Sequence, residues 1–132
     1  MRIDVVTIFP RMLEATMSEG IVQRAREAGL LELQVHDLRL YTEDKHRSVD
    51  DAPFGGGPGR VMKAEPVFRA REALFPDLPE GRSSVVLLSP RGRRFDQVAA
   101  RRFASLDRIV LLCGRYEGID ERVRETVATE EL

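Results

Sequence analysis

The fold of this chain is decided by the stretch Ile109-Val-Leu-Leu-Cys-Gly-Arg-Tyr-Glu-Gly-Ile-Asp120. Its first five residues are apolar without a break, a length that suits a strand better than a helix. Gly114 ends the run, and Asp120 is placed to cap a helix that begins at Glu121. A buried strand, a glycine turn and a helix start form the usual ligand site of an open α/β sheet. The stretch therefore predicts a buried strand and marks a candidate ligand site.

A second unit of the same kind lies just upstream. Ser84–Ser89 predicts another continuous apolar strand, which Pro90-Arg-Gly-Arg93 ends, and Asp96 can cap the following helix. That helix carries the apolar residues Val98, Ala99, Phe103 and Leu106. Because the two strands are expected to be adjacent and parallel, the loops that leave them should lie at the same edge of the sheet.

The first third of the chain predicts two more strands and two short helices. Ile3–Phe9 is apolar and β-branched, which favours a buried strand. Pro10 is tolerated as a first helical residue, and Ile21–Ala28 predicts a second helix that Gly29 ends. Leu31–His36 alternates apolar and polar residues, as a strand with one buried face does.

Periodicity disappears between Tyr41 and Met62, where a polar segment gives way to a glycine-rich one. So long a connection in a compact domain is uncommon and usually functional or mobile. Glu65-Pro66 then opens a helix whose apolar residues are expected to face inward: Val67, Phe68, Leu74 and Phe75. The resulting order of elements predicts an α/β domain with a mostly parallel sheet and helices on both faces, and 132 residues bound one domain.

Composition restricts the class of protein but not its partner. The formal net charge is −1, although arginines crowd one segment, at Arg91, Arg93, Arg94, Arg101 and Arg102. A phosphate-rich partner and an ordinary solvated helix face are equally compatible with that patch. The single cysteine, Cys113, lies in an apolar run and is expected to be a buried small hydrophobe. No apolar stretch approaches the roughly 20 residues of a membrane span, and Met1-Arg-Ile-Asp4 begins a strand rather than a signal peptide, so a cytoplasmic location is expected.

The loops after the two apolar strands could hold a flat ligand. Glycine-bearing loops expose backbone groups that can bind a purine edge, Tyr116 could pack on a flat ligand, and Glu117 could answer a positive charge. The alternative is that the glycines only make turns and that Tyr116 is half-buried packing. Residue types alone leave both interpretations open.

Known nucleotide and metal motifs are mostly missing. No G-x-G-x-x-G follows a strand, and Gly55-Gly-Gly-Pro-Gly59 lacks the Lys-Ser/Thr ending of a P-loop. The spacing of His36, His46 and the pair Asp50-Asp51 matches no structural zinc site. Asp50-Asp51 could hold Mg²⁺ in a nucleotide hydrolase, which is an alternative function, although a solvated loop is the commoner fate of such a pair.

Four segments together resemble the bacterial tRNA (guanine-N1)-methyltransferases. They are Ile3–Pro10, the long loop Asp44–Gly59, Leu88-Ser-Pro-Arg-Gly92 and Leu112–Val123, and the match spans essentially the whole chain in order. The resemblance implies a methyl transfer from S-adenosylmethionine to N1 of the guanine 3′ of the tRNA anticodon. It also implies a SPOUT-type α/β fold with a trefoil knot and a homodimer whose sites are shared between subunits.

The resemblance assigns site residues by position. The cofactor-binding residues would be Leu88, Ser89, Pro90, Gly92, Gly114, Tyr116, Glu117 and Gly118. The residues that face the target guanine and the partner subunit would be Asp50, Gly55, Gly56, Gly57, Pro58 and Gly59. Arg91 stands where the family more often has glutamine, and the basic segment around it could meet tRNA phosphates.

The resemblance covers only the N-terminal part of the family's pattern. Residues 1–132 would be the S-adenosylmethionine-binding SPOUT domain, incomplete at its C-terminal end, without the helical tRNA-binding domain that follows in the family. The general base that guanine N1 needs is expected beyond Leu132, so no catalytic residue is assigned and the chain alone is expected to be inactive. A non-catalytic binding or dimerisation module is the second alternative.

Overall fold

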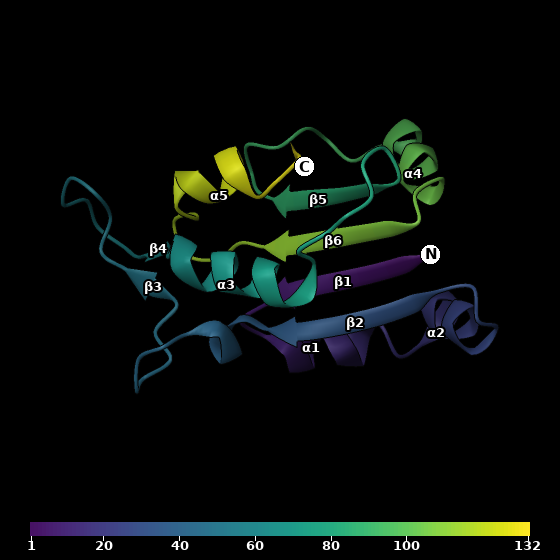
Figure 1. Ribbon diagram of the computed structural model, residues 1–132, viewed down its shortest axis with the longest axis horizontal. Coiled ribbons are helices and arrows are strands. Elements are labelled where there is room, and N and C mark those ends of the chain that lie inside the picture. The colour runs from purple at the N-terminus through teal and green to yellow at the C-terminus, as the bar shows by residue number, and fades with distance from the viewer.

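The computed structural model describes residues 1–132, and a five-stranded parallel sheet forms its centre (Figure 1). The sheet has the strand order β2-β1-β6-β5-β7, and β3 and β4 form a separate antiparallel pair. The strands are β1 (Arg2–Thr7), β2 (Glu32–Asp37), β3 (Asp50–Asp51), β4 (Val61–Met62), β5 (Ser83–Leu88), β6 (Arg108–Cys113) and β7 (Glu130–Glu131). The helices are α1 (Pro10–Thr16), α2 (Gly20–Glu27), α3 (Ala64–Leu74), α4 (Gln97–Ala104), α5 (Glu121–Thr126) and a 3₁₀ turn at Leu38–Tyr41.

The two continuous apolar runs form neighbouring inner strands. In β6, Ile109 lies opposite Ile3 of β1 on one side and Ser84 of β5 on the other. A strand with partners on both edges and helices on both faces buries most of its side chains, which favours a continuous apolar run. The predicted mostly parallel α/β sheet is therefore confirmed.

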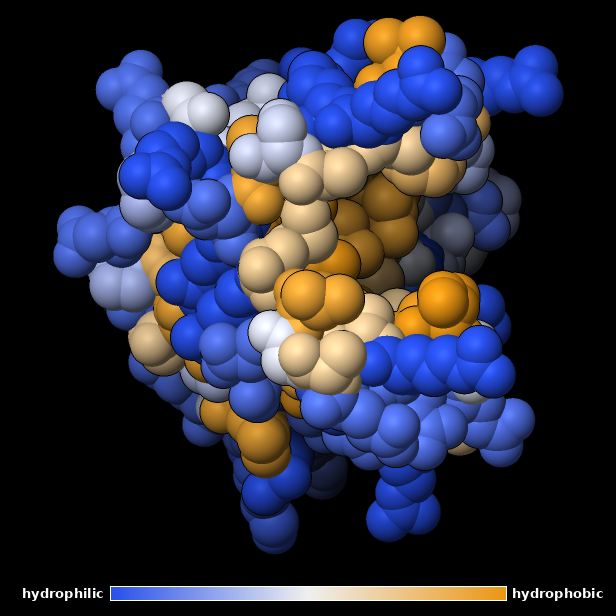
Figure 2. Space-filling model, turned by 90° about the vertical axis from the view of Figure 1, so that its right-hand side faces the viewer, coloured by the Kyte–Doolittle hydropathy of each residue, from blue (hydrophilic) through white to orange (hydrophobic).

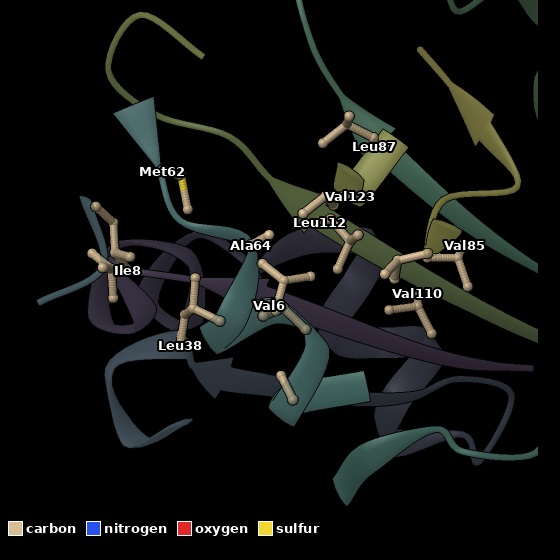
Figure 3. Close-up of a cluster of buried hydrophobic side chains, with 14 of the residues drawn as sticks. Val6, Ile8, Leu38, Met62, Ala64, Val85, Leu87, Val110, Leu112 and Val123 are labelled. Carbon is tan, nitrogen blue, oxygen red and sulfur yellow. The ribbon is translucent and has the colours of Figure 1, made fainter. Parts of the chain in front are cut away.

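One face of the sheet is covered by α3 and α5 (Figure 1). The core on this face is a cluster of 15 buried residues, several of which are drawn in Figure 3. Val6, Val110 and Leu112 point from the sheet towards Ala64 of α3 and Val123 of α5, and each is at most 2% exposed. This packing holds the ends of the strands in fixed positions relative to α3 and α5.

The opposite face is covered less completely. Phe103 of α4 packs with Val86 and Ile109, while α1 and α2, which lie behind the sheet in Figure 1, contain no fully buried residue. Val98 of α4 is 77% exposed, because Ala99 and Phe103 take the inner face of that helix. A groove of about 470 Å³ remains, and apolar side chains gather round a hollow in Figure 2. The groove is lined by Met1, Ile3, Leu88, Phe95, Ala100, Phe103, Ala104, Ile109, Leu111 and Leu132.

The predicted helix ends are confirmed. The Asp96 carboxylate accepts a hydrogen bond from the Ala99 N–H at 2.8 Å, and the Asp120 carboxylate accepts one from the Arg122 N–H at 3.0 Å. Both carboxylates thus satisfy amides that the first helical turn leaves free. Gly29 follows α2 with a φ of +72°, a conformation that favours glycine.

The segment predicted to lack regular structure contains one short pairing. Asp50 and Asp51 of β3 pair with Met62 and Val61 of β4, which closes the long loop at its base. Two residues a strand are too few to show a period in the sequence, so this pairing was not predicted.

A buried carboxylate joins three strands at the opposite end of the sheet. Asp4 of β1 is 0% exposed and accepts hydrogen bonds from Arg2 Nε at 3.1 Å and Arg108 Nε at 2.9 Å. His36 Nε2 of β2 lies 2.8 Å from the same carboxylate. Arg108 also donates to the Leu74 carbonyl at 2.9 Å, which ties this cluster to α3. We call these residues the Asp4 cluster.

Candidate functional site

The loops that follow β5 and β6 meet at the carboxyl edge of the sheet, as expected. Leu88 pairs with Cys113 in the last register position, and Gly114 follows directly. A Cβ on Gly114 would lie 3.3 Å from the Leu88 carbonyl oxygen, closer than most real Cβ contacts. Glycine at this position therefore lets the two loops leave the sheet close together.

Between these loops lies a pocket of about 570 Å³, which we call the strand-end pocket. Of the eight residues assigned to cofactor binding, these seven line it: Leu88, Ser89, Pro90, Gly114, Tyr116, Glu117 and Gly118. The other lining residues are Val61, Leu87, Arg91, Arg115, Ile119, Glu121 and Glu131. A volume of this size suits a small-molecule ligand.

Gly92 is the exception among the eight. A Cβ there would lie 2.2 Å from the Leu132 carbonyl carbon, so the backbone of Leu132, directly after β7, fills the space of its side chain. Ser89 N donates to the Leu132 carbonyl at 2.8 Å, and Arg93 N donates to the Glu131 carbonyl at 3.0 Å. The structure thus places Gly92 in the contact between this loop and β7 rather than in the pocket wall.

Charged groups gather at the pocket wall. Arg91 Nη2 lies 3.2 Å from Glu121 Oε2, and the Ser89 hydroxyl donates to Glu131 Oε1 at 2.5 Å. The Arg124 guanidinium, and then Arg91, hold the pKa of Glu121 below its usual value. The Glu117 carboxylate has neither an ion pair nor a hydrogen bond, so it is free to meet a positive group on a ligand.

Sequence analysis did not identify Glu121 and Glu131 as pocket residues. Glu121 follows the helix cap Asp120, so the predicted helix start already placed it near the loop edge. Glu131 reaches the pocket on β7, a two-residue edge strand of glutamates that no hydrophobic pattern signals. The position of Glu121 could have been predicted from the Asp120 cap, whereas that of Glu131 could not.

The loop after β6 holds an unusual backbone conformation. Tyr116 has a φ of +63° and is 42% exposed, although this conformation is uncommon for a residue other than glycine. Beside it, the Arg115 guanidinium lies 5.2 Å from the centre of the Phe9 ring. Tyr116 is therefore not packing in the core, and its ring is accessible at the pocket.

The end of the long loop is held against the pocket wall. Arg60 carbonyl accepts a hydrogen bond from Glu117 N at 3.0 Å, and the Gly118 carbonyl accepts one from Met62 N at 3.0 Å. Gly59 has a φ of +91°, and a Cβ there would lie 2.5 Å from Glu117 Cγ. Only glycine therefore fits where the long loop crosses the loop after β6.

None of the residues assigned to the guanine side lines the strand-end pocket. Asp50 pairs with Arg60 Nε at 2.5 Å, Pro58 is exposed, and Gly55, Gly56 and Gly57 have open space where a Cβ would stand. They project on a loop beyond the sheet, at the left of Figure 1.

The geometry does not favour the magnesium-dependent alternative. Asp50 is engaged by Arg60, and the chain contains no group of three or more His, Cys, Asp or Glu side chains that could hold a metal ion. His36 belongs to the Asp4 cluster instead.

Cys113, expected to be buried, is of intermediate exposure. None of the helices has the length and apolar character needed to cross a bilayer.

Comparison with known proteins identifies the family of this chain. The family model described as tRNA (Guanine-1)-methyltransferase TrmD matches residues 1–132. The chain is 49% identical over 132 residues to the tRNA (guanine-N(1)-)-methyltransferase of Geobacter metallireducens, covering all of this chain and 53% of that protein. It is 51% identical over 136 residues to that of Koribacter versatilis, covering all of this chain and 51% of that protein.

A solved structure shows the same fold. The crystal structure of tRNA (m1G37) methyltransferase from Aquifex aeolicus matches with a TM-score of 0.88 and 35% identity, covering 99% of this chain and 58% of that chain. The predicted SPOUT-type α/β fold is thereby confirmed. The chain spans about half the length of the curated relatives it matches. On the family match over its whole length, this chain belongs to the tRNA (guanine-1)-methyltransferase family.

Proposed function

We propose that this chain is the S-adenosylmethionine-binding domain of a tRNA (guanine-N1)-methyltransferase and holds its methyl donor in the strand-end pocket. The observation that carries the proposal is the convergence of two glycine loops on one pocket, in a chain that matches the family throughout. When bound, the cofactor supplies an electrophilic methyl group on a positively charged sulfur.

The pocket residues fit such a ligand. The backbone groups of Leu88–Pro90 and Gly114–Gly118 can bind the adenine edge, because the glycines leave these groups accessible. The unpaired Glu117 carboxylate can stabilise the positive sulfur, and the exposed Tyr116 ring can pack on a flat group. Glycine at position 114 avoids a close contact in the pocket wall, since even a Cβ would press on the Leu88 carbonyl.

The nucleic-acid partner in this proposal is a tRNA with a guanine 3′ of its anticodon, methylated in the cytoplasm. The projecting loop at Asp50 and Gly55–Gly59 would approach that guanine and a second subunit of a homodimer. The loop is anchored to the pocket wall through Arg60 and Met62, which supports a connection between the two sites. Guanine N1–H is a weak acid that needs a base, and we assign that role to none of residues 1–132.

Calorimetric titration of the chain with S-adenosylmethionine tests the proposal. We expect binding, and we expect Gly114→Val to weaken it at least tenfold because the added side chain fills the pocket and presses on the Leu88 carbonyl. Gly57→Val is the matched control, since nothing lies within 4 Å of a Cβ at Gly57. A chain that binds no S-adenosylmethionine, or binds it equally well in the Gly114 variant, would show that the strand-end pocket is not the cofactor site.

A further inference from the structure

One ion pair bridges the two sides of the strand-end pocket. Arg91 comes from the loop after β5, and Glu121 is the first residue of α5, 30 positions later. Their charged atoms, Nη2 and Oε2, lie 3.2 Å apart, and both residues line the pocket. The fold thus presents a positive and a negative group side by side to any ligand in the pocket.

This pair is available for binding. The Arg91 side chain is 69% exposed and the Glu121 side chain 46% exposed, and such ion pairs contribute little to stability. The Arg91 guanidinium has no other side-chain partner, so most of its N–H donors are free. The Glu121 carboxylate also pairs with Arg124 through Oε1, so Oε2 is the oxygen that faces Arg91. A ligand can therefore insert between Arg91 and Oε2 at small cost to the fold.

The other charged groups of the pocket are engaged differently. The Arg115 guanidinium lies over the Phe9 ring, and the Glu131 carboxylate accepts the Ser89 hydroxyl. Glu117 has no cationic neighbour in the structure. Arg91 and Glu121 are consequently the only lining residues that offer both signs of charge at one point.

We propose that Arg91 and Glu121 bind the amino acid end of the methyl donor, an inference that rests on the proposed function. An α-amino acid carries a carboxylate and an ammonium group on one carbon, which complements a guanidinium and a carboxylate held side by side. The planar fork of Arg91 suits the carboxylate, and Glu121 accepts hydrogen bonds from the ammonium group. The two residues thereby select a ligand with an intact amino acid group over a bare thioadenosine.

Titration with three adenosine ligands tests this assignment. S-adenosylmethionine carries both charges of the amino acid, decarboxylated S-adenosylmethionine keeps only the ammonium group, and 5′-methylthioadenosine has neither. We expect Arg91→Gln and Glu121→Gln each to weaken S-adenosylmethionine binding about tenfold or more, the effect of losing a hydrogen bond between charged groups. Only Glu121→Gln should weaken the decarboxylated ligand to that extent, and both variants should bind methylthioadenosine within twofold of the unmodified chain.

The matched control is Arg94→Gln, which removes an exposed arginine of the same segment that does not line the pocket. Thermal unfolding should change little in Arg91→Gln and Glu121→Gln, because their side chains are 69% and 46% exposed and exposed ion pairs contribute little to stability. Unchanged S-adenosylmethionine binding in Arg91→Gln and Glu121→Gln would overturn the assignment and leave the proposed function intact. Equal weakening of methylthioadenosine would also overturn it, since the residues would then act on the adenosine part. Failure of the unmodified chain to bind any of the three would overturn the proposed function as well.

Discussion

Removing the charge of Asp4 should destabilise the protein more than removing any exposed carboxylate. Asp4 is fully buried and is contacted by Arg2, Arg108 and His36. Asp4→Asn keeps the shape of the side chain but leaves these groups without their anion. The substitution therefore isolates the electrostatic part of the Asp4 cluster.

The expected loss of unfolding free energy follows from the exposure of each partner of Asp4. Breaking a buried ion pair costs about 3–5 kcal/mol when a charge is left unpaired. Arg2 is 39% exposed and can turn to water, and Arg108 keeps its hydrogen bond to the Leu74 carbonyl, so the lower end applies. We expect Asp4→Asn to lower the free energy of unfolding by about 3 kcal/mol and the melting temperature by about 10 °C.

The pH dependence of this difference has a definite sign. Burial raises the pKa of Asp4, but hydrogen bonds from His36, Arg2 and Arg108 outweigh it and hold the pKa below its usual value. A carboxyl whose pKa is lowered by folding contributes fully above its unfolded pKa of about 3.9 and loses that contribution as the pH falls through the folded value. The difference in unfolding free energy between the two proteins should therefore narrow below about pH 4.

Urea unfolding followed by circular dichroism measures these free energies between pH 7 and pH 3. Asp107→Asn is the matched control, because its ion pair with Arg82 joins side chains that are 53% and 72% exposed. That control should cost less than about 1 kcal/mol. The reasoning fails if Asp4→Asn costs no more than the control, or if the difference in unfolding free energy does not narrow below about pH 4.

Three further outcomes follow from local geometry. Gly59→Ala should cost about 1–3 kcal/mol in urea unfolding, because its φ is +91° and its Cβ would meet the Glu117 side chain; Glu117→Ala in the same chain should recover only part of this, and full recovery would rule out backbone strain. Asp96→Ala should cost about 1 kcal/mol by losing the cap on the Ala99 N–H, and an unchanged melting temperature would contradict that role. Burial raises the pKa of the Cys113 thiol, so its reaction with a disulfide reagent at pH 8 should be slower than that of free cysteine and should accelerate at higher pH; a rate equal to free cysteine would refute this.

The sequence was informative wherever a local pattern carried the physics. The apolar runs that became β5 and β6 were predicted because strands covered on both faces must be apolar throughout. The helix starts at Asp96 and Asp120 were predicted because a cap is a contact between residues two or three apart. Both loops could then be placed at one edge of the sheet, and these loops form most of the wall of the strand-end pocket.

What could not be predicted depends on residues far apart in the chain. The edge strand β7 is two glutamates, paired with Val86 and Leu87 more than forty positions earlier, and has no hydrophobic period. The resemblance assigned Gly92 to the cofactor wall, and no local pattern shows that a Cβ there would meet the backbone of Leu132. The Asp4 cluster joins residues 32 and 104 positions apart, so no local spacing signals it.

The inner position of β1 in the sheet also has a consequence for synthesis on the ribosome. β1 lies between β2 and β6. The ion pair of Asp4 with Arg108 can form only after 104 further residues have been synthesised. At bacterial and eukaryotic elongation rates of about 5–20 residues per second, that interval lasts roughly 5–20 s. During it, β1 can pair on one edge only, with β2, and its other edge presents free amides and carbonyls to neighbouring nascent chains. A translational pause just before β6 would prolong the exposure of that edge, and chaperones that bind nascent chains would have longest to act there.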